Sequence, residues 1–301
     1  MIDFKALETF VWVANLRSFR RAAERLNTTQ PAISMRIAQL EDFLGARLLD
    51  RDRRQVAPTP KGQELLVHAE RLLRMRADMV ESIGDPAAVR GIVRLGVSES
   101  IVHTWLPALI ERVNAAYRNL ELEIEVDSSP NLYDRLLSKD LNLAFLLGPA
   151  NNPEVHSRPL CTLSVAFLAS SKIKLPRSSV ELEDIAKWPI ITFSRNTQPY
   201  IALRELFARK GLRPTIHASA SLATVVRMAL DGIGIAVMPP AILKNLAPGE
   251  KLQRLRTRVE LPPLDFVVSW PAAPDSPAAQ KVAEIALGVA RKNAKTVSKT
   301  V

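Results

Sequence analysis

The chain has 301 residues, of which 47% are hydrophobic and 24% charged, a balance typical of a globular protein with about two domains. No apolar run reaches the roughly 18 residues that span a bilayer, the first ten residues do not resemble a secretion signal, and the lone Cys161 excludes an internal disulfide. We therefore expect a cytoplasmic protein. The net charge of +10 favours a polyanionic partner, but it is divided: residues 1–61 hold 11 Lys and Arg against 7 Asp and Glu, and residues 281–301 carry a similar excess.

Three short helical patterns follow one another in the first 45 residues. Apolar side chains recur at helical spacing over about 4–14, 19–26 and 33–44. Ser18 is placed to cap the second helix, and Gly45 stands where a glycine ends the third. Because the connections are only a few residues long, the pattern predicts a helix-turn-helix of the DNA-binding kind.

The third helix is expected to begin with a face that carries few large side chains. Thr28 or Thr29 can cap it, and a proline suits its first turn, where the backbone N–H has no helical partner. The residues of this face are Gln30, Pro31, Ala32, Ser34 and Met35. Such a face can approach base edges in a major groove about 12 Å wide, and the Gln30 amide can bind adenine. The alternative is a capped helix on the surface of any small helical bundle.

Two short extended segments lie between residues 46 and 60, around a charged turn. This arrangement predicts the wing of a winged helix-turn-helix. The arginines of the turn, and those at the start of the second helix, are the expected contacts to backbone phosphates: Arg20, Arg21, Arg51, Arg53 and Arg54. A solvated turn is the alternative, and the adjacent helix is what favours DNA.

The stretch "SFRRAAERLNTTQPAISMRIAQLEDFLGARLLDR", followed by "TPKG" at 59–62, resembles the N-terminal signature of the LysR-type transcriptional regulators. Leu49 stands where that family has Phe, and Pro58 replaces an apolar residue before Thr-Pro. The resemblance implies sequence-specific binding to double-stranded DNA at an inverted-repeat operator, with binding or bending modulated by a small-molecule effector. It also implies assembly from a homodimer to a homotetramer, with RNA polymerase as a further partner.

A long helix is expected after the wing, from Thr59-Pro60 to the "GDP" at 84–86. Apolar residues recur along it at steps of four and three, which is typical of a heptad seam. The residues assigned to dimerisation are Leu65, Ala69, Leu72, Met79 and Ile83. Arg76 lies within the same seam at a local cost. The alternative is an amphipathic helix that packs only on its own domain.

From Gly91 onward, short apolar strands alternate with helical segments, which predicts α/β architecture with mostly parallel sheets. The overall fold class is therefore α+β: a winged helix-turn-helix over 1–58, a linker helix over 59–88, and a C-terminal domain over 89–301. By the same resemblance, this last domain is a two-lobed effector domain like type 2 periplasmic binding proteins. One lobe comprises about 90–161 and 266–301, and the other about 162–265.

Several of the predicted strands end in small polar residues. Hydroxyls and helix N-termini that meet at one cleft suit a small anion, especially a carboxylate, and an arginine can add a charged contact. The expected effector-binding residues are Ser98, Ser100, Ser128, Ser129, Ser194, Arg195 and Ser219. Taken singly, each of these serines is more often a helix cap.

Two other classes of protein fit the sequence less well. A periplasmic solute-binding protein is disfavoured by the missing signal and the added winged helix. An enzyme is disfavoured because "GVSES" lacks the final glycine of a nucleophile elbow, the four histidines have no metal spacing, and no glycine-rich phosphate loop is present. No catalytic residue, metal or cofactor is expected. The effector, the operator and the direction of regulation are not encoded in any motif.

Overall fold

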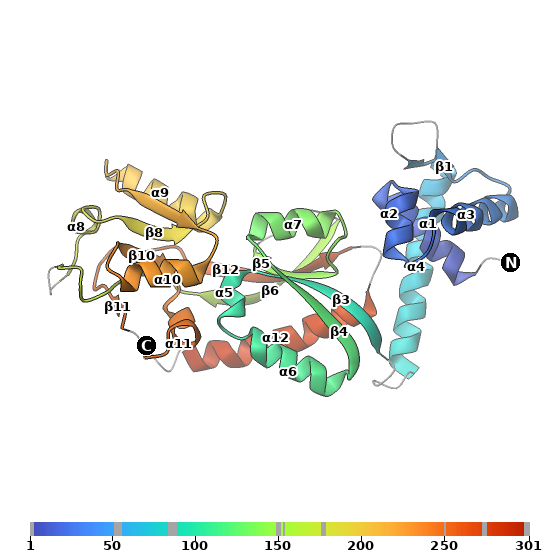
Figure 1. The fold of residues 1–301 in the computed structure, drawn as a ribbon. Helices are drawn as coiled ribbons and strands as arrows, with labels where there is room; N and C mark the ends of the chain where they lie inside the picture. The colour runs from blue at the N-terminus through green and yellow to red at the C-terminus, as the bar shows by residue number, and fades with distance from the viewer. Residues whose placement is uncertain are drawn as a thin grey trace.

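A computed structural model describes residues 3–50, 56–83, 89–148, 152, 154–175, 179–249, 251–272 and 276–297. Figure 1 shows an elongated molecule, with the N-terminal helices at one end, a long helix beside them, and two α/β lobes beyond. None of the helices in the described ranges is long and apolar enough to cross a membrane.

The N-terminal domain is built from short helices around one small core. Its elements are α1 (Phe4–Leu16), α2 (Phe19–Arg25), α3 (Gln30–Leu44), β1 (Leu49–Asp50), β2 (Ala57–Pro58) and α4 (Pro60–Ile83). Ser18 and Thr29 cap α2 and α3 through their side-chain oxygens, and Gly45 ends α3 in the left-handed region at φ 63°. Phe10 of α1 and Ile33 and Ile37 of α3 are fully buried in this core. The three predicted helices and their caps are therefore confirmed.

The short β1–β2 hairpin is fastened to the helices by a carboxylate and a hydroxyl. Glu41 Oε1 accepts hydrogen bonds from the backbone N–H groups of Leu48 and Leu49, at 2.8 and 3.2 Å. Thr59 caps α4 by accepting from Gly62 N at 3.0 Å, and its own N–H donates to Leu48 O at 2.9 Å. These bonds fix where the wing leaves α3 and where α4 begins.

The first lobe contains one five-stranded sheet, in the order β4-β3-β5-β12-β6. Its strands are β3 (Arg90–Val97), β4 (Asn119–Val126), β5 (Leu143–Leu147), β6 (Val155–Leu163) and β12 (Leu264–Pro271). Its helices are α5 (Glu99–Val102), α6 (Leu106–Ala116), α7 (Ser129–Leu137) and α12 (Pro277–Val297). The helices α6 and α12 cover one face of the sheet, and α7 covers the other (Figure 1).

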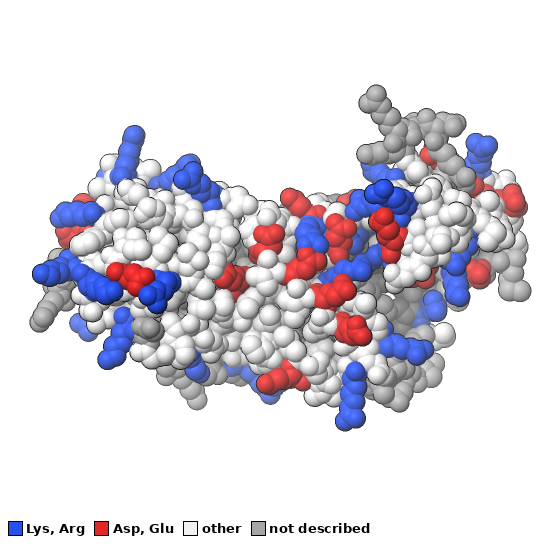
Figure 2. Space-filling model, in the orientation of Figure 1, with Lys and Arg blue, Asp and Glu red and all other residues white. Residues whose placement is uncertain are grey.

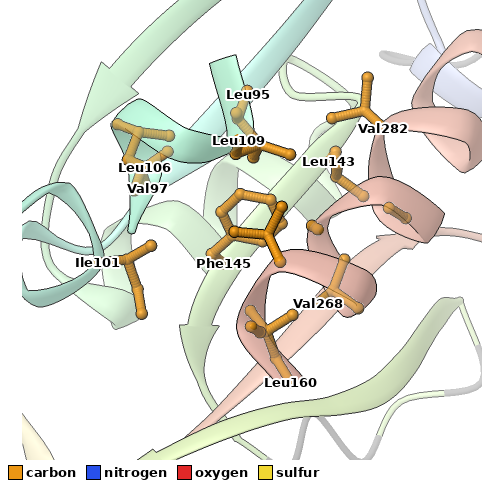
Figure 3. Packing of buried hydrophobic residues seen from close by; sticks show 14 of the residues in the cluster. Leu95, Val97, Ile101, Leu106, Leu109, Leu143, Phe145, Leu160, Val268 and Val282 are labelled. Carbon is orange, nitrogen blue, oxygen red and sulfur yellow. The ribbon is translucent and has the colours of Figure 1, made fainter. Parts of the chain in front are cut away.

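The main core of this lobe lies between the sheet and the helices α6 and α12. Figure 3 shows Leu95, Leu143 and Phe145 of the central strands meeting Leu109 of α6 and Val282 of α12. All five side chains are fully buried. Because both faces of β5 are covered, this strand reads in sequence as a continuous apolar run, whereas only the second half of β3 is mostly buried.

The second lobe contains a second five-stranded sheet, in the order β11-β7-β10-β8-β9. Its strands are β7 (Ala166–Ala169), β8 (Ile190–Phe193), β9 (Ile216–Ser219), β10 (Ile235–Met238) and β11 (Gln253–Arg254). Its helices are α8 (Leu182–Ile185), α9 (Gln198–Arg209), α10 (Leu222–Leu230), α11 (Leu243–Leu246) and a 3₁₀ turn at Pro240–Ile242. The helices α8 and α9 pack on one face and α10 on the other.

The expectation of mostly parallel sheets is wrong. In each sheet two of the pairings are parallel and two are antiparallel, because β12 runs against β5 and β6, and β7 runs against β10 and β11. Three strands were also not predicted: β6, β9 and β11. Pro159 obscured β6, and it is tolerated there because β6 is an edge strand with a register shift opposite Phe266 and Val267.

The close approach of α4 to the wing gives a test of this packing. A Cβ atom on Gly62 would collide with the main-chain oxygen of Leu48, and backbone cannot move aside as a flexible side chain can. We expect Gly62→Ala to destabilise the N-terminal domain by about 1–3 kcal/mol, seen as a lower midpoint of thermal unfolding.

The matched control is Gly288→Ala, in the interior of α12, where an added Cβ meets nothing within 4 Å. This change should stabilise the protein slightly, by up to about 1 kcal/mol, because alanine favours helix more than glycine does. Equal midpoints for the Gly62 variant and the wild type would show that the Leu48 contact yields without cost.

Candidate nucleic-acid interface and ligand cleft

The exposed side of α3 carries the residues predicted to face DNA. Gln30, Pro31 and Met35 are exposed, with Met35 at 59%, while Ala32 and Ser34 are half-buried. Thr29, the other exposed residue of this group, accepts from Ala32 N at 3.4 Å, and Thr28 is half-buried beside it. The opposite side of the helix is held in the core, so the small face at its N-terminus is open to a partner.

The predicted phosphate-binding arginines fall into three groups. Arg20 is exposed and pairs with Glu24 one turn along α2, at 3.4 Å. Arg21 turns toward the first lobe, where Nη2 donates to the backbone oxygen of Ser138 at 3.1 Å and lies 3.3 Å from Asp140 Oδ1. The arginines at 51, 53 and 54 lie outside the described residues. Arg21 is therefore not an open cationic group in this structure.

Two of the residues assigned to the dimerisation seam of α4 pack on the protein's own N-terminal domain. Ala69 is fully buried and Leu65 is half-buried against the core around α1, which corrects the assignment of both. Arg76 also leaves the seam, because its guanidinium lies over the Phe4 ring at 5.0 Å. The alternative of a helix packed on its own domain thus holds for the first half of α4.

An exposed apolar stripe remains along the second half of α4. Leu72, Met75 and Met79 are 46%, 58% and 56% exposed and lie on one side of the helix at spacings of three and four residues. The side chain of Ile83 lies outside the description, although its backbone belongs to the helix. The stripe is shorter than the predicted seam. It includes Met75, which does not fall on the alternating steps of four and three that define a heptad seam.

A cleft of about 280 Å³ lies between the two lobes. It is lined from the first lobe by the ends of β3, β4 and β5 and from the second by the ends of β8 and β9. Six of the seven predicted effector residues line it: Ser98, Ser100, Ser128, Ser129, Ser194 and Ser219. Phe193, Leu222, Leu264 and Phe266 add apolar surface. The hydroxyls of separate strand ends are thus brought to one place.

Arg195 is exposed and is not among the residues that line the cleft, so its assignment to the ligand site is corrected. The described lining contains no Lys or Arg at all. The charged residues of the lining are Glu99 and Asp127, so attraction of an anion would have to come from backbone N–H groups and helix N-termini.

The serines of the cleft differ in what they already bind. Ser129 Oγ accepts from Leu147 N at 2.9 Å, which ties α7 to β5. Ser219 Oγ accepts from Ser221 N at 3.1 Å, just before α10. Ser128 Oγ is buried without a hydrogen-bond partner among the described residues. A buried hydroxyl without a partner costs free energy, so a ligand oxygen that reached it would be stabilised there.

Glu99 joins the two lobes across the cleft and was not predicted. Its Oε2 accepts from Leu222 N, in the first turn of α10, at 2.7 Å, and its Oε1 lies 3.4 Å from His103 Nε2. Asn245 makes a second bridge by donating to the backbone oxygens of His103 and Thr104, at 3.0 and 3.2 Å. A carboxylate of the chain itself thus occupies the positive end of α10, a contact between positions 123 residues apart that no local pattern indicates.

Cys161 does not provide a reactive thiol. Burial raises its pKa to about 11, with a smaller opposing effect from the neighbouring Trp105 side chain. At neutral pH the group is protonated, and the protonated thiol is a poor nucleophile.

Comparisons with known proteins identify both parts of the chain. The family model described as "Bacterial regulatory helix-turn-helix protein, lysR family" matches residues 4–63, and the model "LysR substrate binding domain" matches residues 86–291. Similar curated proteins include the HTH-type transcriptional regulator BbuR of Bordetella bronchiseptica, 28% identical over 254 residues that cover 83% of this chain and 78% of that protein. Another is GltR of Bacillus subtilis, 25% identical over 267 residues and 88% of both chains.

Solved structures with the same fold cover nearly the whole chain. A variant of full-length OxyR from Pseudomonas aeruginosa has a TM-score of 0.65 at 21% identity, covering 97% of this chain and 95% of that one. HinK, a LysR family transcriptional regulator from the same organism, has a TM-score of 0.56 at 23% identity, covering 98% and 100%. Together with the family models, these likenesses confirm a regulator rather than an enzyme: the chain belongs to the LysR family of bacterial transcriptional regulators, with a helix-turn-helix DNA-binding domain and an effector-binding domain.

Proposed function

We propose that this regulator reads an inverted-repeat operator with the exposed face of α3, and that a small organic acid in the cleft between the lobes modulates the complex. The observation that carries the DNA part is the open, small-residue N-terminus of α3, where Gln30, Pro31 and Met35 are exposed above a fully buried apolar side. A helix of this shape enters a major groove, and its free N–H groups suit nearby phosphates.

The proposal of an acidic ligand is supported by a hydrogen bond that the cleft already makes to a carboxylate, that of Glu99. Glu99 places one oxygen 2.7 Å from Leu222 N at the start of α10, within reach of the pocket serines. An acid of the right size can take the same position and leave Glu99 beside His103. The unpartnered Ser128 hydroxyl offers a further donor or acceptor to such a ligand. Ligand and DNA affect one another only if the acid binds one arrangement of the lobes more tightly than another.

The assembly part rests on the exposed stripe of α4. Leu72 and Met75 expose about half of their side chains in the middle of a 24-residue helix, which a second copy of α4 would cover. Two chains joined in this way would present two winged helices to two half-sites of an inverted repeat. A tetramer through the effector domains is an extension of this proposal that follows the family.

DNA recognition can be tested by separating base contacts from phosphate contacts. After selection of a bound sequence from a random library, Gln30→Ala should cost about 1–3 kcal/mol on the selected sequence and little on a scrambled one. Arg20→Ala should weaken binding to both DNA sequences. It should also make the logarithmic dependence of affinity on salt shallower by about the slope of one phosphate contact. Fluorescence anisotropy at several salt concentrations measures both effects.

Arg204→Ala, an exposed arginine of α9 in the second lobe, is the matched control and should change neither affinity. The assignment is wrong if Gln30→Ala and Arg20→Ala weaken the two DNA sequences by the same factor.

Assembly can be tested with a charge placed on the stripe. Leu72→Glu would bury a carboxylate between two helices, so the variant should sediment with about half the wild-type mass and lose affinity for the inverted repeat. Val67→Glu is the control, because Val67 is 60% exposed on a different side of the same helix. If the Leu72→Glu variant sedimented with the same mass as the wild type, the stripe would be excluded as the dimer contact.

The ligand can be tested by a thermal-shift screen of small carboxylic acids against wild type, Glu99→Gln and the control Glu111→Gln, which changes an exposed residue of α6. An acid that binds should raise the unfolding temperature by mass action, and it should bind Glu99→Gln more tightly because the competing charge is gone. The corresponding neutral amides should not bind. Hits that were all neutral or cationic would refute the organic acid.

A further inference from the structure

The N-terminal domain is docked on the first lobe through the end of α7. Arg21 of α2 reaches the turn that follows α7, where it binds the Ser138 backbone oxygen and the Asp140 carboxylate, at 3.1 and 3.3 Å. The two residues of the ion pair are roughly half exposed, at 42% and 48% of their side chains. This contact joins positions 119 residues apart and links the two domains of one chain.

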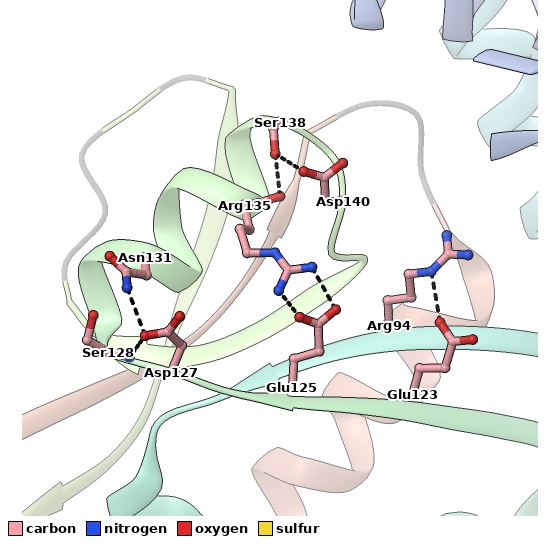
Figure 4. A network of polar contacts seen from close by, with 9 residues as sticks. All are labelled: Arg94, Glu123, Glu125, Asp127, Ser128, Asn131, Arg135, Ser138 and Asp140. Carbon is pink, nitrogen blue, oxygen red and sulfur yellow. Dashed lines mark hydrogen bonds and ion pairs between the residues drawn. The ribbon is translucent and has the colours of Figure 1, made fainter. Parts of the chain in front are cut away.

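The Asp140 side of the contact is held in place. Ser138 Oγ donates to Asp140 Oδ2 at 2.6 Å, and Asp140 N donates to the Arg135 backbone oxygen at 3.0 Å (Figure 4). Lys139, between them, adopts a left-handed backbone at φ 62°, which forms the tight turn. Arg135 is itself paired with Glu125 of β4. The carboxylate that receives Arg21 is therefore fixed to the sheet rather than carried on a loose loop.

The charges around the Arg21–Asp140 contact include both acidic side chains and enclosed cations. Figure 2 shows Asp and Glu side chains over the first lobe, with several Lys and Arg among them. The strand β4 carries Glu121, Glu123 and Glu125, of which Glu123 pairs with Arg94 and Glu125 with Arg135. Beside the Arg21 pair, however, Arg25 is enclosed at the seam and lies 4.9 Å from the Trp12 ring. Burial, and then the charge of Arg94, lower the pKa of Arg25 to about 10, and burial lowers the pKa of Lys139 to about 8. Enclosing these two cations therefore opposes the docking.

We infer that Asp140 is an internal competitor for DNA: it holds Arg21 against the first lobe, and Arg21 must leave Asp140 to bind a backbone phosphate. The Arg21 Nη2 group that contacts Ser138 O and Asp140 Oδ1 must give up these partners to bind a phosphate, so docking and phosphate binding compete for it. The inference rests on the proposed DNA binding by the helix-turn-helix and on the expectation from the sequence that Arg21 contacts a backbone phosphate. It adds a regulatory role for Asp140, which no feature of the helix-turn-helix indicates.

The position of α7 gives this competition a path to the ligand cleft. The helix begins at Ser129, whose hydroxyl lines the cleft, and ends one residue before Ser138, which accepts from Arg21. A nine-residue helix spans about 14 Å as a rigid unit. A ligand that displaced the start of α7 would therefore move the Asp140 turn as well.

The inference can be tested without knowing the operator, because phosphate contacts do not depend on sequence. The probe is a fluorescent duplex of 30 base pairs with mixed sequence, titrated with the full chain at several salt concentrations. Asp140→Asn should bind about two- to fivefold more tightly than wild type, as expected for releasing an exposed ion pair. The logarithmic salt slope should stay close to the wild-type value, because Arg21 neutralises the same phosphate in both complexes.

Three further variants make the result specific. Asp134→Asn removes an exposed carboxylate of the same helix that has no contact with α2 among the described residues, so it measures the general effect of lost negative charge. Arg21→Ala should bind less tightly than wild type, and the double variant Arg21→Ala/Asp140→Asn should gain nothing over Arg21→Ala. Asp140→Ala should repeat the gain of Asp140→Asn, and unchanged circular dichroism confirms the fold of each variant.

The outcomes separate this inference from the proposed function. Asp140→Asn binding no more tightly than Asp134→Asn, or less tightly than wild type, would overturn the competition while leaving DNA binding intact. A gain that persisted in the double variant would also overturn it. Failure of the wild-type chain to bind any duplex would instead refute the proposed DNA interface.

Discussion

The position of β12 determines most of the architecture of the effector domain. The strand is the last one in the chain, yet it lies inside the first sheet, between β5 and β6 and antiparallel to both. The chain must therefore leave the first sheet after β6, build the second sheet, and return. The two crossings place the strand ends of both lobes opposite one another, and the cleft lies between them. Leu264 and Phe266 of β12 themselves form part of its wall.

The chemistry of the cleft follows from this arrangement. Each serine that lines it stands at or near the end of a strand, where a helix begins and backbone N–H groups lack helical partners. No Lys or Arg is among the described residues that line the cleft, and the Glu99 carboxylate accepts a hydrogen bond from one of these backbone groups, Leu222 N. Any acidic ligand must compete with a group that the protein supplies.

The linker helix α4 has two tasks on two sides. One side buries Leu66 and Ala69 against α1 and so fixes the helix to the DNA-binding domain. The other exposes Leu72 and Met75, which a single chain leaves in water. A helix buries only the side that faces a neighbour, so the wide apolar stripe of the sequence divides into residues that pack on α1 and residues that remain exposed.

Local sequence patterns predicted the N-terminal helices and the central strands in their order, although β6, β9 and β11 were missed. Ser18, Thr29 and Gly45 marked the helix ends, because a cap acts on backbone groups within a few residues of itself, and the apolar runs marked the central strands. The sequence also placed five of the cleft serines at the ends of predicted strands, since parallel strands end at a common edge, and it placed Ser219 before a helix although β9 itself was not predicted.

Contacts between positions far apart in the sequence depend on how the whole chain packs and could not be predicted from local patterns. Arg195 lies close in sequence to Ser194 but outside the cleft, while Glu99 meets Leu222 and Arg21 meets Asp140 across more than a hundred residues. Ala69 was assigned to a partner helix and packs on α1, and β6 was hidden by its proline until the sheet order made it an edge. Periodicity reports which side of an element is apolar, but not which neighbour covers it, because that depends on how the whole chain packs.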